Sequence, residues 1–227
     1  MTGAPAGVRA LRPQTLPLRA AVRLVVGVVV VLAVLSTFLD SASRDAVNPF
    51  NFFGFFTIQG NLLAAGVLLL AAVLQIRGAA EPEWLLPVRA AVTTYMSVVG
   101  VVYNLLLAGL PGGVELAWAN WVMHVGFPVY AVLDWVVAAD RRALSYRVLR
   151  LVLVFPLAWV TVVLVRGAAD GWVPYPFLDP ASGYASVALY VVVIAVAVVA
   201  FGAVVILISR RARPVAELVG EARRGRA

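Results

Sequence analysis

Long apolar stretches separated by short polar connections run through almost the whole chain. A membrane-spanning helix needs about 20 apolar residues, and six stretches reach that length. They cover residues 18–39, 53–76, 86–110, 117–138, 147–166 and 184–209. The fifth is the weakest, because Arg147 and Arg150 lie at its start and Pro156 interrupts it. The pattern predicts an all-α polytopic membrane protein, a bundle of six transmembrane helices.

The placement of arginine orients this bundle, because cytoplasmic loops carry an excess of positive charge. All but two arginines lie in the N-terminal arm and first helical turn, in the second and fourth connections, or in the C-terminal tail; the exceptions are Arg44 and Arg166. We therefore expect both termini in the cytoplasm. Residues 1–17 are then a cytoplasmic arm, residues 18–209 the transmembrane domain, and residues 210–227 a basic cytoplasmic tail.

The first apolar stretch also invites comparison with a secretory signal peptide, with Ser41-Ala-Ser43 as the cleavage site. Its apolar run exceeds the usual length of about 7–15 residues, and its removal would leave five helices. We expect it to be a retained helix.

Composition agrees with a membrane protein and excludes several chemistries. Of the 227 residues, 63% are hydrophobic, against about 45–50% in soluble domains. All 18 basic residues are arginine, so a lysine Schiff base is excluded, and the lack of cysteine excludes thiolates and iron–sulfur clusters. A single histidine is too few for a bis-histidine haem or a usual zinc site. We expect no cofactor and no metal. The net charge of +7 indicates contact with anionic lipid, not with nucleic acid.

Two polar islands interrupt the apolar helices. One is Thr57–Asn61 at the start of the second predicted helix, and the other surrounds His124, the single histidine, in the fourth. An ionisable side chain inside a membrane helix is by default a candidate for function. A rise of 1.5 Å per residue places polar groups of three predicted helices about 5–11 Å below the outer face: Thr57, Tyr103, Asn104, Asn120 and His124. Thr57 and Asn61 share one helix face, as do Asn120 and His124.

A hydroxyl and an imidazole at matched depth can act as a nucleophile and its base. We predict Thr57 as the nucleophile and His124 as the base in the outer leaflet, where a lipid ester is a suitable substrate. Asp134 lies about 15 Å further along the helix, so we expect it to pair with Arg141 or Arg89 instead. Candidates for binding substrate or stabilising an oxyanion are Gln59, Asn61, Tyr103, Asn104, Asn120 and Tyr175. Threonine and asparagine also hold membrane helices together without any chemistry.

Three patches resemble the androgen-induced-protein-like membrane proteins, which include atypical threonine hydrolases of fatty acid esters of hydroxy fatty acids. Phe55-Phe56-Thr57 is similar to the family's element with the catalytic threonine. Trp118-Ala-Asn-Trp-Val-Met-His124, followed by Pro128 and Asp134, is similar to its Trp-x-Asn-x-x-Met-His stretch with the catalytic histidine. The segment 171–179, with Tyr-Pro-Phe-Leu inside it, is similar to an element before the last helix. The resemblance implies a six-helix fold and roles for Thr57 and His124. Trp121 departs from the histidine of some relatives, and the third patch has one extra residue.

Together these features predict an integral membrane hydrolase of fatty acid esters in the plasma membrane of a bacterium, with a lipid ester as substrate and membrane lipids around it. Residues 167–183 are expected to be either an outer lid that holds Tyr175 and Asp179, or a simple interfacial loop. The main alternative is a non-enzymatic lipid-binding or transport protein, and a third is a structural subunit. Few interior charges and no broken helices argue against transport. The oligomeric state stays open.

Overall fold

The computed structural model describes residues 15–110, 114–137 and 142–211, and every regular element in these ranges is helical. Most of the expected N-terminal arm and almost all of the basic tail lie outside the described residues. The elements are α1 (Thr15–Arg44), α2 (Pro49–Phe52), α3 (Phe56–Arg77), α4 (Leu85–Val102), the π-helix η1 (Tyr103–Leu107), α5 (Ala117–Trp121), the π-helix η2 (Val122–Gly126), α6 (Phe127–Val137), α7 (Val148–Ala169), the short 3₁₀ helices η3 (Pro176–Leu178) and η4 (Pro180–Ser182), and α8 (Tyr184–Arg211).

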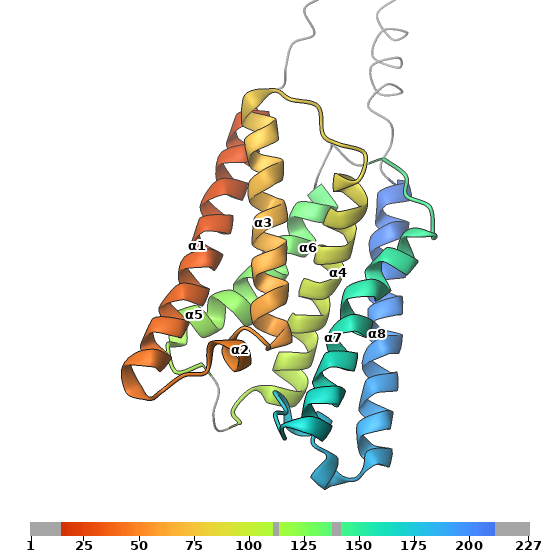
Figure 1. Cartoon of the computed structure of the whole chain (residues 1–227). Coiled ribbons are helices and arrows are strands. Elements are labelled where there is room, and N and C mark those ends of the chain that lie inside the picture. The colour runs from red at the N-terminus through yellow and green to blue at the C-terminus, as the bar shows by residue number, and fades with distance from the viewer. Residues whose placement is uncertain (1–14, 111–113, 138–141, 212–227) are drawn as a thin grey trace, which may run out of the picture.

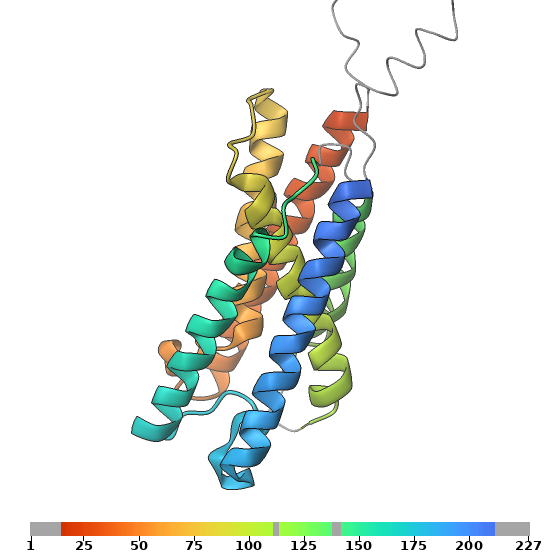
Figure 2. The same cartoon turned by 90° about the vertical axis from the view of Figure 1, so that its right-hand side faces the viewer.

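The long helices alternate in direction along the bundle (Figure 1). α1 packs along α3, and α4 lies at the centre, in contact with α3, α6, α7 and α8. Figure 2 shows the same bundle from the side of α8. Small residues at buried positions of α4, such as Ala90, Ala91 and Thr94, allow this close approach, because helices without large side chains between them can bring their backbones together.

Five helices are long and apolar enough to cross a membrane: Leu18–Arg44, Phe56–Arg77, Leu85–Leu107, Val148–Ala169 and Tyr184–Arg211. They correspond to five of the six predicted spans. The remaining one, residues 117–138, is not among them; α5, η2 and α6 follow one another directly there. Asn120, His124 and Asp134 lower its apolar character. The segment with the weakest membrane-spanning character is therefore the fourth and not the fifth, since α7 continues as one helix through Pro156.

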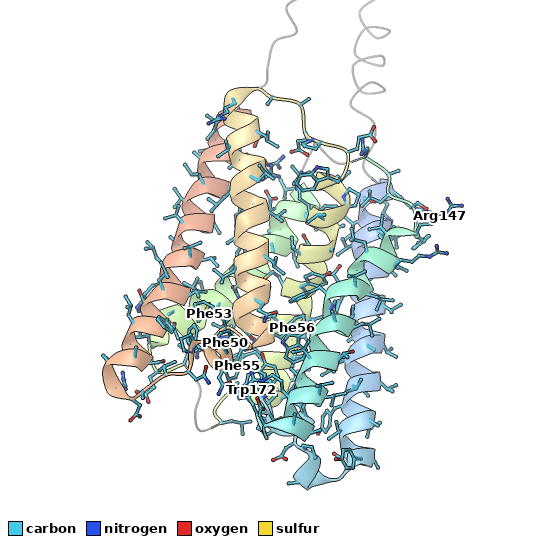
Figure 3. All side chains as sticks on the ribbon, in the orientation of Figure 1. Phe50, Phe53, Phe55, Phe56, Arg147 and Trp172 are labelled. Atoms are coloured by element: carbon cyan, nitrogen blue, oxygen red, sulfur yellow. The ribbon has the colours of Figure 1, made fainter. Side chains whose placement is uncertain are left out.

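The two ends of the bundle differ in charge. α1, α4 and α7 begin and α3 and α8 end at the same end of the bundle, the arginine-rich end. The described arginines other than Arg44 and Arg166 lie near these helix ends, and Figure 3 labels Arg147 among them. Near this end Asp134 pairs with Arg23 at 2.9 Å and with Arg89 at 3.6 Å. Pairing with Arg89 was expected, whereas Arg141 lies outside the described residues. The ion pair between Arg23 and Asp134 is not predicted by the sequence. It buries the Arg23 side chain, which is 0% exposed.

Candidate functional site

Thr57 lies in the first turn of α3, at the end of the bundle opposite the arginine-rich end. It is buried, and Phe55 before it is extended and offers the helix no side-chain cap. The first N–H groups of a helix have no partner within the helix. The N–H of Thr57 instead donates to the phenol oxygen of Tyr175 at 3.2 Å, and the Thr57 hydroxyl is 3.4 Å from the same oxygen. A loop residue far along the chain thus completes the start of α3.

His124 is buried within the π-helix η2. Its Nδ1 lies 3.0 Å from the carbonyl oxygen of Asn120. Because a carbonyl only accepts hydrogen bonds, Nδ1 carries the proton and Nε2 keeps its lone pair. Within the described part of the chain, Nε2 has no hydrogen-bond partner. The imidazole is therefore held in the form that can act as a base.

The imidazole also stacks on Tyr103, with the ring centroids 3.7 Å apart. Tyr103 begins the other π-helix, η1, so both rings come from π-helical turns on facing segments. Such turns are rare and occur frequently at functional sites, because the extra residue redirects side chains and loosens the backbone ladder. Here the two turns bring two aromatic rings face to face.

Asn61 ties the two halves of the site together. Its side-chain nitrogen donates to the carbonyl of Thr57 at 2.8 Å and to the carbonyl of Met123, which precedes His124, at 3.2 Å. Its side-chain oxygen is buried and has no partner among the described residues. Asn61 therefore holds α3 against η2. It does not itself line the cavity with Thr57.

Asn104 and Asn120 support the histidine in a similar way. The amide of Asn104 donates to the carbonyl of Gly100 at 2.7 Å and to that of His124 at 3.4 Å. The amide of Asn120 donates to the hydroxyl of Tyr103 at 2.7 Å. Like Asn61, Asn120 has a buried side-chain oxygen with no described partner. These two predicted site residues thus position the rings rather than face the cavity.

A cavity of about 260 Å³ is lined by both Thr57 and His124, together with Tyr103 and Tyr175. A second cavity of about 90 Å³ has a mostly apolar lining, chiefly from α4, α7 and α8. It shares the residues Thr57, Tyr103, Leu107 and Tyr175 with the first. No hydrogen bond joins Thr57 to His124 among the described contacts. The hydroxyl and the imidazole thus face a common space that adjoins an apolar one.

Gln59 points elsewhere. Its amide donates to the carbonyl of Phe53 at 2.8 Å, and it borders a separate groove that contains Arg166 and Trp172. The structure therefore does not bring this predicted oxyanion donor to the cavity of Thr57. The reason is local: Gln59 lies on a different face of α3 from Thr57 and Asn61.

The connection from α7 to α8 is partly buried. Pro174, Tyr175 and Leu178 are buried, whereas Asp179 is exposed and accepts from the N–H of Ala181 at 2.8 Å, at the start of η4. Burial raises the pKa of Tyr175, against the opposing effect of its hydrogen bonds with Thr57. The phenol therefore stays protonated at neutral pH and can donate. Of the two expected lid residues, only Tyr175 reaches the cavities.

Sequence reasoning missed Trp159 of α7. Its indole N–H donates to the carbonyl of Gly54 at 2.8 Å, and its ring packs against Phe56 and Tyr175 with centroids 5.2 and 5.8 Å away. A tryptophan inside an apolar helix predicts a contact with another segment, because its indole N–H needs a hydrogen-bond partner when buried. Figure 3 labels Phe50, Phe53, Phe55, Phe56 and Trp172 at this end of the bundle, and the ring centroids of Phe55 and Trp172 lie 6.1 Å apart. Phe56 is packed inside the bundle, whereas Phe50 is 83% exposed.

Comparison of the chain with protein-family models, with curated proteins and with solved structures gives no match.

Proposed function

We propose that the protein is an integral membrane hydrolase of fatty acid esters, with Thr57 as nucleophile and His124 as general base. One observation carries the proposal: Thr57 and His124, from segments far apart in the sequence, line one cavity, and Nε2 of His124 is unpartnered among the described residues. The resemblance of the patches around these two residues to the androgen-induced-protein-like family supports the same roles. An apolar cavity beside them suits an acyl chain.

The first half of the reaction forms an acyl-enzyme. Nε2 of His124 takes the proton of the Thr57 hydroxyl as Oγ bonds to the ester carbonyl carbon. The tetrahedral intermediate collapses, the bond to the alcohol oxygen breaks, and the leaving alkoxide takes the proton from His124. A hydrogen-bonded distance between Oγ and Nε2 is needed at that moment, and catalytic hydrogen bonds are often long before substrate binds. The absence of a direct bond between the two side chains is compatible with this requirement.

The second half releases the acid. Water gives a proton to His124 and its oxygen attacks the acyl carbonyl, after which the Thr57 Oγ leaves and regains that proton. Negative charge develops on the carbonyl oxygen in both steps. The Tyr175 hydroxyl lies 3.4 Å from Thr57 Oγ and is protonated, so it can donate to that oxygen. Gln59 takes no part, because its amide is bonded to Phe53 outside the cavity.

We place the protein in the plasma membrane of a bacterium with six spans and both termini in the cytoplasm. The arginine-rich end of the bundle is then the cytoplasmic end, as charge bias requires. The segment 117–137 is then the fourth of the six spans. Asn120, His124 and Asp134 each make a hydrogen bond or ion pair inside the bundle, where such residues are tolerated. In this orientation Thr57 and His124 lie in the outer leaflet, within reach of lipid esters.

Labelling with a fluorophosphonate probe tests the proposal on the purified protein in detergent. We expect the wild type to be labelled and labelling to be lost in Thr57→Ala and in His124→Ala. Thr161→Ala is the matched control, since Thr161 is an exposed threonine whose hydroxyl donates to the carbonyl of Leu157. Full labelling of a folded Thr57→Ala protein rules out the proposed nucleophile.

The second candidate function is lipid binding without hydrolysis. The apolar cavity and the missing hydrogen bond between Thr57 and His124 favour it. A protein of this kind would bind fatty acyl ligands with wild-type affinity after His124→Ala, and would show no ester turnover in any variant.

A further inference from the structure

The smaller cavity runs from Thr57 towards the middle of the bundle. Its lining extends from Tyr103 of η1 back to Val98 of α4, and on α8 from Val191 on to Val198. Seven residues of helix between Val191 and Val198 correspond to about 10 Å along the bundle. The cavity is thus an elongated pocket that starts at the proposed nucleophile and points towards the arginine-rich end.

The far end of this pocket is closed. Val98 and Val198 are 3% and 2% exposed. One turn beyond Val198, a Cβ on Gly202 would lie 2.9 Å from Leu149 and 3.4 Å from Val152, both on α7. Because the backbone of α8 approaches α7 so closely there, no chain can pass further. Figures 1 and 2 both show α7 and α8 side by side along this stretch.

The walls of the pocket are mostly apolar and suit hydrocarbon. Apart from Thr57, Tyr103 and Tyr175 at its mouth, and the indole of Trp159, which already bonds to Gly54, its lining is aliphatic, phenylalanine or proline. Its side wall includes Leu157, which is 52% exposed on the outer surface of α7.

We propose that this pocket holds the acyl chain of the substrate and limits it to medium length, with Val98 and Val198 as the residues that set the limit. This inference rests on the proposed function for the position of the ester carbonyl at Thr57. An extended chain advances about 1.25 Å per carbon, so about eight carbons match the length of roughly 10 Å over which α8 lines the pocket. The alcohol portion then occupies the larger cavity on the His124 side.

The length of the chain should therefore control turnover in a defined way. Each buried methylene improves binding about fourfold, so the efficiency rises with chain length until the base is reached. A longer chain must leave part of itself outside or displace the packed valines, which costs affinity. The substrate class is accordingly medium-chain fatty acyl esters.

The test is a series of 4-nitrophenyl esters from butyrate to palmitate, hydrolysed by the purified protein in detergent. We expect kcat/KM to peak near the octanoate and to be at least tenfold lower for the palmitate. Val198→Phe should cut octanoate turnover about tenfold and spare the butyrate. Val196→Phe is the matched control, because Val196 of α8 is 63% exposed. It should keep the wild-type dependence of turnover on chain length. If Val198→Phe does not fold, Val198→Ala should move the peak to longer chains.

Binding separates failure of the pocket from failure of the hydrolase. In Thr57→Ala, 2-bromooctanoate should quench tryptophan fluorescence through Trp159, and Val198→Phe in that background should weaken quenching about tenfold. If Thr57-dependent turnover is independent of chain length, or Val196→Phe changes it as much as Val198→Phe, the pocket assignment is wrong and the hydrolase stands. If no ester is turned over but quenching follows the valine variants, the pocket stands and the hydrolase is wrong.

Discussion

The phenol oxygen of Tyr175 lies 3.2 Å from the backbone nitrogen of Thr57 and 3.4 Å from its hydroxyl oxygen. The tyrosine thereby takes the place of a helix cap and at the same time fixes the threonine hydroxyl at the junction of two cavities. Its ring is held by Phe55, Trp159 and Phe177 at centroid distances between 5.3 and 5.8 Å. The connection between α7 and α8 is therefore a wall of the candidate site and not a free interfacial loop.

Removing the nucleophile or the base should abolish ester hydrolysis. We expect Thr57→Ala and His124→Ala each to lower kcat by about a thousandfold or more, and the double variant to be no worse, because the two groups act in one step. Thr57→Ser keeps a hydroxyl and should retain measurable activity. Turnover of 4-nitrophenyl octanoate by purified protein measures each variant. A double variant that multiplies the two single losses would contradict a shared step.

Tyr175→Phe should lower kcat by about a hundredfold, as does removal of an oxyanion donor in other enzymes. KM should change little, since the aromatic ring and its packing remain. Tyr184→Phe is the control, because Tyr184 is 75% exposed. Unchanged kcat in Tyr175→Phe would assign the phenol a purely structural role in capping α3.

Asn61→Ala should destabilise the protein by about 0.5–2 kcal/mol, the range found for interhelical hydrogen bonds in membranes. It removes both bonds that join the carbonyls of Thr57 and Met123, so kcat should fall as well. Asn104→Ala should have a smaller effect, because its contact with the His124 carbonyl is longer, at 3.4 Å. Thermal unfolding in detergent and ester turnover provide the two measurements. A wild-type Tm and kcat in Asn61→Ala would show that other contacts hold α3 against η2.

Arg23→Ala should reduce stability strongly, by about 3–5 kcal/mol, because it leaves the buried carboxylate of Asp134 without its closest partner. Arg44→Ala should cost little stability, since the Arg44 side chain is 48% exposed and pairs with Asp40 at the surface.

Asp134→Asn should leave the chemical step nearly intact, because Asp134 lies about 15 Å from His124 along the helix. Tm and kcat, determined side by side, separate the two effects. A large fall in kcat for folded Asp134→Asn would couple this ion pair to the site.

The proposed orientation predicts which introduced cysteines react with an impermeant thiol reagent on intact cells. A cysteine at Ser182, which is exposed between α7 and α8, should be labelled from outside, whereas one at Ala143 should not. A cysteine at Gly113 should also be labelled, although Gly113 lies outside the described residues. The natural chain has no cysteine and gives no background. The reverse pattern would place the site in the inner leaflet.

Hydropathy along the chain determined five helices long enough to span a membrane, because apolar length is a local property that each segment carries by itself. Helical rise and spacing likewise put Thr57 and His124 at one depth, and the structure brings them to one cavity. Composition alone excluded lysine and cysteine chemistry. The apolar lengths, the depths and the excluded chemistries do not depend on how the helices pack, whereas the shared cavity does.

Tertiary structure decided the rest, because the rotation of each helix about its axis and the path of each loop depend on contacts between distant segments. It paired Asp134 with Arg23, 111 residues away, where the sequence had suggested nearer arginines. It turned Gln59 away from the cavity and made Asn61 a tie between α3 and η2. It also folded Tyr175 back onto Thr57 across 118 residues of sequence. Local pattern supplies the depth of a side chain in a membrane helix, but only packing determines what that side chain faces.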